Sequence, residues 1–132
     1  MKRINWSAVF IGLLVDIGGT MFLAFLLVFA QNLAGVTILD PSAQDVDALL
    51  IQFVFGMAFT IFGGFVAGMV AQRDFVLNGA LVGALSLVFS GISLAFDSTT
   101  PLWYEAAAAI AVTPAAALGG LIASVIGRRE TQ

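Results

Sequence analysis

The sequence contains neither cysteine nor histidine, and it has few charged residues. Without cysteine the chain has no disulfide, thiol nucleophile or cysteine-ligated cluster, and without histidine it lacks the commonest general base and metal ligand. Only 10% of its 132 residues are charged, compared with about 25% in an average soluble domain. A pI near 4.4 and only five basic residues argue against nucleic-acid binding. We therefore expect no metal, no cofactor and no nucleic-acid partner.

Apolar residues are what the chain has in excess: they make up 61% of it, and the mean hydropathy is +1.07. A hydrocarbon core of about 30 Å needs about 20 mostly apolar residues per helix. Four stretches meet this requirement, so we predict an all-α membrane protein with one four-helix transmembrane domain over residues 1–132. The predicted spans are residues 6–29, 49–71, 79–96 and 102–126.

The cationic residues of this predicted bundle all fall on one side of it. They lie at the N-terminus, between the second and third spans, and at the C-terminus, and they are Lys2, Arg3, Arg73, Arg128 and Arg129. The positive-inside rule therefore predicts a multi-pass protein of the cytoplasmic membrane with both termini in the cytoplasm. Aromatic residues favour the membrane interfaces, so we expect Trp6 on one side, and Trp103 with Tyr104 on the other, to act as interface anchors.

A cleavable signal peptide is the competing interpretation of the N-terminal segment, because Lys2 and Arg3 precede an apolar run. That run is longer than a usual signal-peptide core, and it contains Asp16. Both features favour a first membrane helix that is not cleaved from the protein.

Two segments of the chain resemble each other. Residues 62–74 and 118–130 align without gaps and share two adjacent glycines, an alanine and an arginine. We interpret them as the ends of two tandem helical hairpins in parallel orientation, produced by duplication. The alternative is convergence, since small residues recur in many membrane helices.

Small residues also recur at steps of three and four along the predicted spans, which places them on one face of each helix. Because lipid is as apolar as leucine, membrane helices associate through close contact between such residues. We therefore predict a tight bundle of the glycine-zipper type. The predicted packing residues are Gly12, Gly19, Gly56, Gly63, Gly64, Ala67, Gly68, Gly79, Gly83, Gly119, Gly120 and Ala123.

Asp16 is the only charged residue well inside a predicted span. It lies ten residues beyond Trp6, or about 15 Å along a helix, and so near the midplane. Thr60, Ser90 and Thr113 fall at a similar depth, which predicts one polar layer with a residue from each helix. Asp16 is then either a hydrogen-bonded structural residue, which fixes helix register or joins protomers, or a proton carrier in a transport cycle.

No arrangement of residues indicates an enzyme. An intramembrane aspartyl protease needs two deep aspartates, and serine proteolysis needs a histidine base. The glycine pairs at 18–19 and 63–64 lie inside apolar runs with no lysine after them, so they are not phosphate-binding loops.

The chain carries two resemblances to known families. The run Gly63-Gly64-Phe65-Val66-Ala67-Gly68, followed by residues 77–83, resembles small uncharacterised prokaryotic four-helix membrane proteins with a GG-x-x-AG hairpin. That resemblance implies a bundle in the cytoplasmic membrane and no established activity. Asp16 followed by Gly19-Thr20 resembles the small multidrug resistance transporters, whose first-helix acid couples proton and substrate.

Taken together, the sequence favours a non-enzymatic integral membrane protein, either an oligomeric scaffold or an accessory subunit of a larger membrane complex. Its expected partners are membrane lipids and further copies of itself or other subunits. The alternative is a small proton-coupled transporter, acting as a dimer, that uses Asp16.

Overall fold

The computed structural model describes residues 4–34, 46–96 and 100–127. Within these ranges it contains four α-helices and no strand. The helices are α1 (Trp6–Ala34), α2 (Val46–Ala71), α3 (Phe75–Phe96) and α4 (Leu102–Gly127). Each is long and apolar enough to cross a membrane. The predicted all-helical class and the four candidate spans are therefore confirmed.

Two helix boundaries differ from the prediction. Helix α1 continues to Ala34, and Asn32 near its end donates its side-chain amide to the Val28 carbonyl. Helix α3 begins at Phe75 rather than at residue 79. Its first helical hydrogen bond runs from the Asn78 amide to the Asp74 carbonyl, so Asn78 lies in the first turn and not in the loop.

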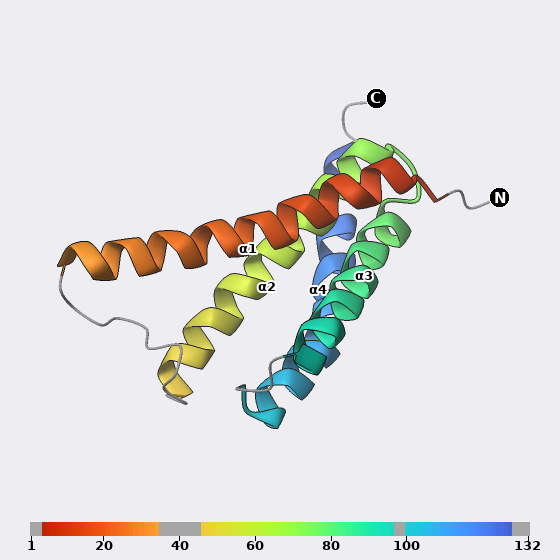
Figure 1. Ribbon diagram of the computed structural model, residues 1–132. Coiled ribbons are helices and arrows are strands. Elements are labelled where there is room, and N and C mark those ends of the chain that lie inside the picture. Colours follow the sequence, from red (N-terminus) through yellow and green to blue (C-terminus); the bar gives the residue numbers. More distant parts are fainter. Residues whose placement is uncertain (1–3, 35–45, 97–99, 128–132) are drawn as a thin grey trace.

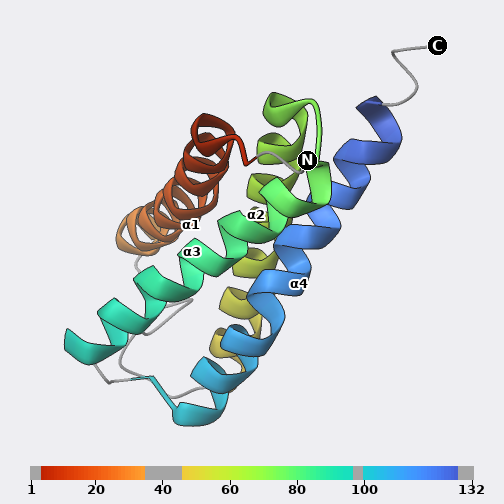
Figure 2. The same ribbon diagram turned by 90° about the vertical axis from the view of Figure 1, so that its right-hand side faces the viewer.

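Figures 1 and 2 show that the bundle has one compact end and one end at which the helices diverge. We call the compact end the closed end; it contains the start of α1, the α2–α3 turn and the end of α4. We call the other end the open end. Helices α2 and α4 run parallel to each other, and α1 and α3 run in the opposite direction. Among the described residues, α1 contacts α2 and α3 but not α4.

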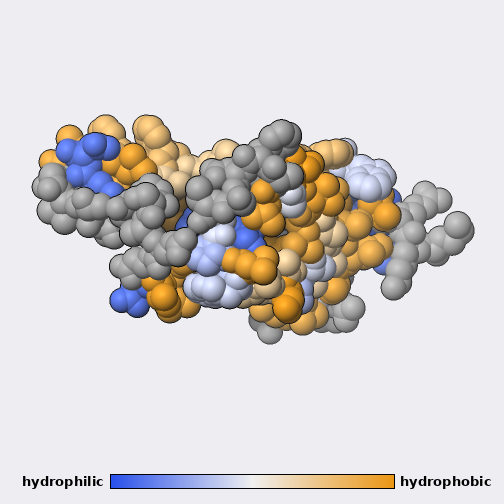
Figure 3. All heavy atoms as spheres, turned by 60° about the horizontal axis from the view of Figure 1, so that its bottom comes forward, coloured by the Kyte–Doolittle hydropathy of each residue, from blue (hydrophilic) through white to orange (hydrophobic). Residues whose placement is uncertain are grey.

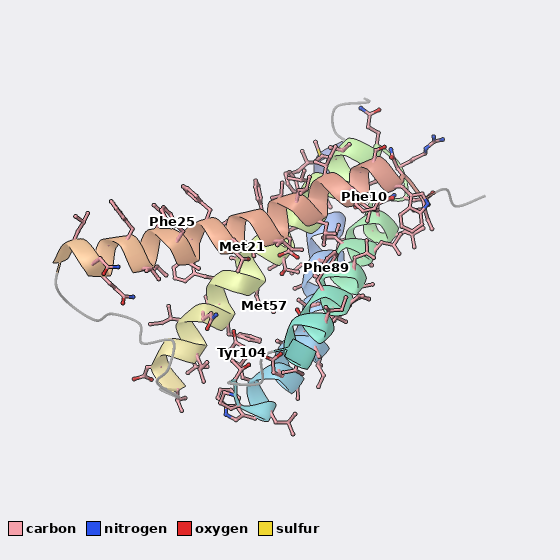
Figure 4. All side chains as sticks on the ribbon, viewed as in Figure 1. Phe10, Met21, Phe25, Met57, Phe89 and Tyr104 are labelled. Carbon is pink, nitrogen blue, oxygen red and sulfur yellow. The ribbon has the colours of Figure 1, made fainter. Side chains whose placement is uncertain are left out.

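Helix α1 leaves the bundle as it approaches the open end (Figure 1). Its first half packs tightly, and Ala8 and Val9 are completely buried. Its second half, residues 21–33, is called the α1 arm below; most of its large side chains are exposed, among them Met21 at 69% and Phe25 at 64%. Figure 4 shows these two residues on the part of α1 that lies apart from α3 and α4.

Small residues form the contacts between the helices. A Cβ atom added at Gly64 would collide with the backbone of Ala116, and one at Gly119 would collide with the Ile61 carbonyl, so α2 and α4 meet backbone to backbone. Ala67, Ala116 and Ala123 are completely buried. Large apolar side chains are mostly on the outside, and hydrophobic residues dominate the coloured surface in Figure 3.

The predicted packing residues lie at these contacts, with one exception. At Gly56 an added Cβ would meet nothing within 4 Å. Gly56 lies on the part of α2 nearer the open end, where the helices have moved apart. Ala67 and Ala123 are completely buried. At every other predicted glycine an added Cβ would come within 3 Å of a neighbouring helix, namely at Gly12, Gly19, Gly63, Gly64, Gly68, Gly79, Gly83, Gly119 and Gly120.

The charged residues used to predict the topology fall mainly outside the described residues. Lys2, Arg3, Arg128 and Arg129 lie there, whereas Arg73 lies in the α2–α3 turn at the closed end. In that turn, Gln72 and Asp74 adopt positive φ angles of 57° and 47°. Reversing the chain in so few residues brings the end of α2 directly against the start of α3.

Candidate functional site: the junction at Asp16

Asp16 is enclosed between α1, α2 and α3, and only 4% of it is exposed. The enclosure depends on glycines on both sides of it. Gly12 lies one turn before Asp16 on α1, and a Cβ there would come within 2.5 Å of the Gly63 carbonyl on α2. A Cβ on Gly63 would in turn come within 2.9 Å of the Asp16 Cβ. The absence of side chains at these two positions lets α2 approach the Asp16 carboxylate closely.

Two hydroxyl groups from two other helices bind the Asp16 carboxylate. Thr60 of α2 donates to Oδ1 at 2.9 Å, and Ser86 of α3 donates to Oδ2. Thr60 is 3% exposed and Ser86 is 7% exposed, so both bonds are shielded from solvent. We call this group of three residues the Asp16 junction. It joins three helices through one side chain, and both carboxylate oxygens have a donor.

The structure brings together only part of the predicted polar layer. Asp16 and Thr60 meet as expected, but the residue of α3 that binds Asp16 is Ser86 rather than Ser90. Ser90 is exposed and lines a shallow groove between α3 and α4. Thr113 packs with its backbone against Gly83 of α3. Since α4 does not contact α1, Thr113 cannot reach Asp16, and the junction has three members instead of four.

A phenylalanine of α2 packs against α1 next to the junction, in the direction of the open end. Phe59 immediately precedes Thr60 on α2, and Gly19 lies one turn after Asp16 on α1. The Phe59 ring occupies the place that a side chain on Gly19 would take. Phe59 is not among the residues predicted from the sequence. The available signal was a glycine one turn from the buried acid, which leaves room for a large neighbour.

A second buried polar group ties α1 to the bundle at the closed end. The Asn78 side chain is completely buried, and its Oδ1 accepts the Asn5 amide at 2.9 Å. Its Nδ2 donates to the carbonyls of Arg73 and Asp74, at 3.2 and 3.1 Å. Asn5 in turn caps α1, because its Oδ1 accepts the Ala8 amide. Asn78 thus joins the start of α1 to the α2–α3 turn, a role that was not predicted from the sequence.

The predicted interface anchors lie at the two ends of the bundle. Trp6 begins α1 at the closed end and is 53% exposed, and Trp103 lies in the first turn of α4 at the open end and is 49% exposed. Tyr104 turns towards α2, where its ring meets Phe53 edge to face with centroids 6.2 Å apart (Figure 4). Tyr104 therefore also joins α4 to α2.

The chemistry open to the Asp16 junction is limited. Among the described residues no group of three or more acidic residues is placed to hold a metal ion. One carboxylate with two hydroxyl partners can hold helices together or can bind and release a proton. No family model, curated protein or solved structure matches the chain. The two family resemblances stay predictions, and we infer function from the geometry of the chain itself.

Proposed function

We propose that the chain is a non-enzymatic integral membrane protein that acts as a subunit of a membrane assembly, either an oligomer of itself or a larger complex. The α1 arm carries this proposal. It extends away from α3 and α4 (Figure 1), and large apolar side chains on it are exposed, Phe22, Phe29 and Leu33 among them at 52% or more. Such a helix presents a long apolar surface that lipid or another protein covers.

The way α1 is held supports the same proposal. At its start, α1 is tied to the α2–α3 turn through Asn78, and at its middle it is tied to α2 and α3 through Asp16. Both ties satisfy their polar groups within the chain. A helix fixed along its first half and mostly exposed along its second can present the second half in a defined direction, as a docking element requires.

The charge distribution and the repeated segment complete the proposal. We propose that both termini lie in the cytoplasm and that the protein resides in the cytoplasmic membrane, because the cationic residues cluster on one side of the predicted spans. We also propose that the two hairpins arose by duplication. The parallel course of α2 and α4 is compatible with this origin.

Purification in a mild detergent tests the assembly proposal, with the mass measured by native mass spectrometry. The expected result is a mass that is a multiple of 13.8 kDa or includes other subunits. Replacing Phe22, Phe25 and Phe29 of the arm with alanine should release the monomer of the variant with its helical content unchanged. The matched control replaces Leu118, Leu121 and Ile122 of α4, which are similarly exposed, and should leave the assembly intact. A wild-type protein that is always monomeric would contradict the proposal.

A second candidate function is proton-coupled transport with Asp16 as the carrier. The observation that favours it is the pair of hydroxyl partners, since a hydroxyl can donate to an ionised carboxylate and accept from a protonated one. Asp16→Asn tests this function because the amide keeps the shape of the protonated acid but cannot exchange a proton. In reconstituted vesicles, loss of pH-driven solute flux with unchanged oligomer mass would favour transport. Unchanged flux, or no flux in the wild type, would exclude it.

A further inference from the structure

One close contact between α1 and α2 lies next to the Asp16 junction in the direction of the open end. Gly19 follows Asp16 by one turn, and Phe59 precedes Thr60 by one residue, so both lie next to the junction in the direction of the open end. The Phe59 ring is so close to Gly19 that any side chain there would collide with its Cδ1 and Cε1 atoms. The ring therefore fills the space between α1 and α2 at Gly19, one turn from Asp16.

Beyond this contact α1 and α2 separate (Figure 1). The α1 arm that follows Gly19 is largely exposed. On the opposite side of Asp16, Gly12 packs against Gly63, Ala67 and Val82. Asp16 thus lies between two close contacts of α1 with α2, at Gly12 towards the closed end and at Gly19 with Phe59 towards the open end.

We propose that the Phe59 ring, seated on Gly19, is a seal that closes Asp16 from the open end, and that separation of α1 from α2 opens it. Gly19 is essential to the seal because only glycine leaves room for the ring. The seal also links the arm to the junction: a movement of the α1 arm away from α2 lifts Gly19 from the ring and exposes the carboxylate. This inference does not depend on the proposed function, because it holds whether Asp16 is structural or carries protons.

The reactivity of Asp16 with dicyclohexylcarbodiimide in lipid vesicles tests the seal. This apolar reagent adds to a protonated carboxyl group, and the adduct rearranges to a stable N-acylurea with no leaving group, so each modification adds the whole mass of the reagent. The rate of modification at Asp16 is read by mass spectrometry of the peptide that contains it. Asp16→Asn provides the unreactive reference.

Phe59→Ala should raise the rate at Asp16 at least about tenfold, a change equivalent to about 1.4 kcal/mol in the barrier to access. Phe59→Leu should restore most of the protection, since leucine also fills the gap. Gly19→Ala should raise the rate with the ring still present, because the added methyl group displaces it. The matched control is Phe62→Ala: Phe62 is 52% exposed and stacks on Phe65, so its removal should leave the rate unchanged.

Equal rates in the wild type, Phe59→Ala and Gly19→Ala would overturn the seal. An equal increase in Phe62→Ala would also overturn it, because the effect would then reflect general loosening of α2. Circular dichroism identifies a variant that does not fold, and in that case Gly19→Ala and Phe59→Leu decide the question. The readout measures neither oligomer mass nor solute flux, so failure of the seal and failure of the proposed function are distinguishable.

Discussion

Both halves of α1 are apolar, but the first half packs much more closely than the second. The first half, up to Gly19, has Ala8 and Val9 completely buried and Gly12 in close contact with α2. In the α1 arm, Phe25 and Phe29 stack on each other with centroids 6.1 Å apart, and both remain more than half exposed. The first half has Gly12 and Gly19 at close contacts and Asp16 bound to two hydroxyls, whereas the arm contains no glycine. In a lipid environment these features, and not hydrophobicity, decide where helices associate.

The two glycine pairs offer a second comparison on a smaller scale. In α2, Gly63 faces α1 and Gly64 faces α4. In α4, Gly119 faces α2 and Gly120 faces α3. Each pair therefore contacts two neighbouring helices. Within the first hairpin, the first glycine of the α2 pair contacts α1; within the second hairpin, it is the second glycine of the α4 pair that contacts α3. The shared sequence provides two faces for close approach, and the surroundings decide which helix uses each face.

The largest effect is expected where the packed half depends on backbone contact. Gly119→Val places two methyl groups against the Ile61 carbonyl and the Phe65 amide, and should lower the free energy of unfolding by at least about 3 kcal/mol. Gly91→Val is the matched control, because an added Cβ at Gly91 meets nothing within 4 Å. Both are measured by circular dichroism during denaturation in mixed micelles. A similar loss in both variants would mean that glycine acts through helix flexibility rather than through contact.

The next effect is expected at the tie near the closed end. Asn78→Ala removes three hydrogen bonds and leaves the Asn5 amide without its partner, which should cost about 2 kcal/mol of unfolding free energy. Asn5→Ala keeps its backbone donor and loses only the cap to Ala8, so the cost should be about 1 kcal/mol. The same denaturation assay compares them. If Asn5→Ala proves the more harmful, Asn78 does not hold α1.

At the Asp16 junction the expected effect is smaller and depends on the replacement. Asp16→Ala leaves the hydroxyls of Thr60 and Ser86 without their acceptor, and should cost about 1–2 kcal/mol, since hydrogen bonds between membrane helices are individually modest. Asp16→Asn can accept from one hydroxyl and donate to the other, so its cost should be under about 1 kcal/mol. Thr60→Val and Ser86→Ala should each lower the unfolding free energy by part of the amount that Asp16→Ala does. Equal stability of the alanine variant and the wild type would show that the junction does not hold the helices together.

The smallest effect is expected in the half that does not pack. Phe25→Ala in the α1 arm removes a side chain that is 64% exposed, and should change the unfolding free energy of the isolated chain by less than about 0.5 kcal/mol. Gly56→Ala, where an added Cβ has open space, should likewise have little effect. A cost above about 2 kcal/mol at Phe25 would mean that the arm folds back onto the bundle, and would remove the contrast between the halves.

The sequence was sufficient for the four helices and not for their arrangement. Helix length and hydropathy suffice to locate a span, because a membrane requires about 20 apolar residues whatever the neighbours are. Depth alone could not decide between Ser86 and Ser90, which lie one turn apart on α3, because that choice depends on how the helix tilts. The role of Asn78 was also hidden, since asparagine is common in turns and only the fold brings Asn5 beside it.

The apolar stretch of α1 also affects how the protein fits its bilayer. Residues Trp6–Leu33 form 28 helical residues, a length of about 42 Å at about 1.5 Å per residue. In a hydrocarbon layer about 30 Å thick, such a rod would have to tilt, kink or thicken the bilayer around it; by tilt alone it would incline about 45° from the normal. A thicker membrane would reduce the tilt of α1 and a thinner one would increase it. Through this one helix the protein would therefore respond to membrane thickness.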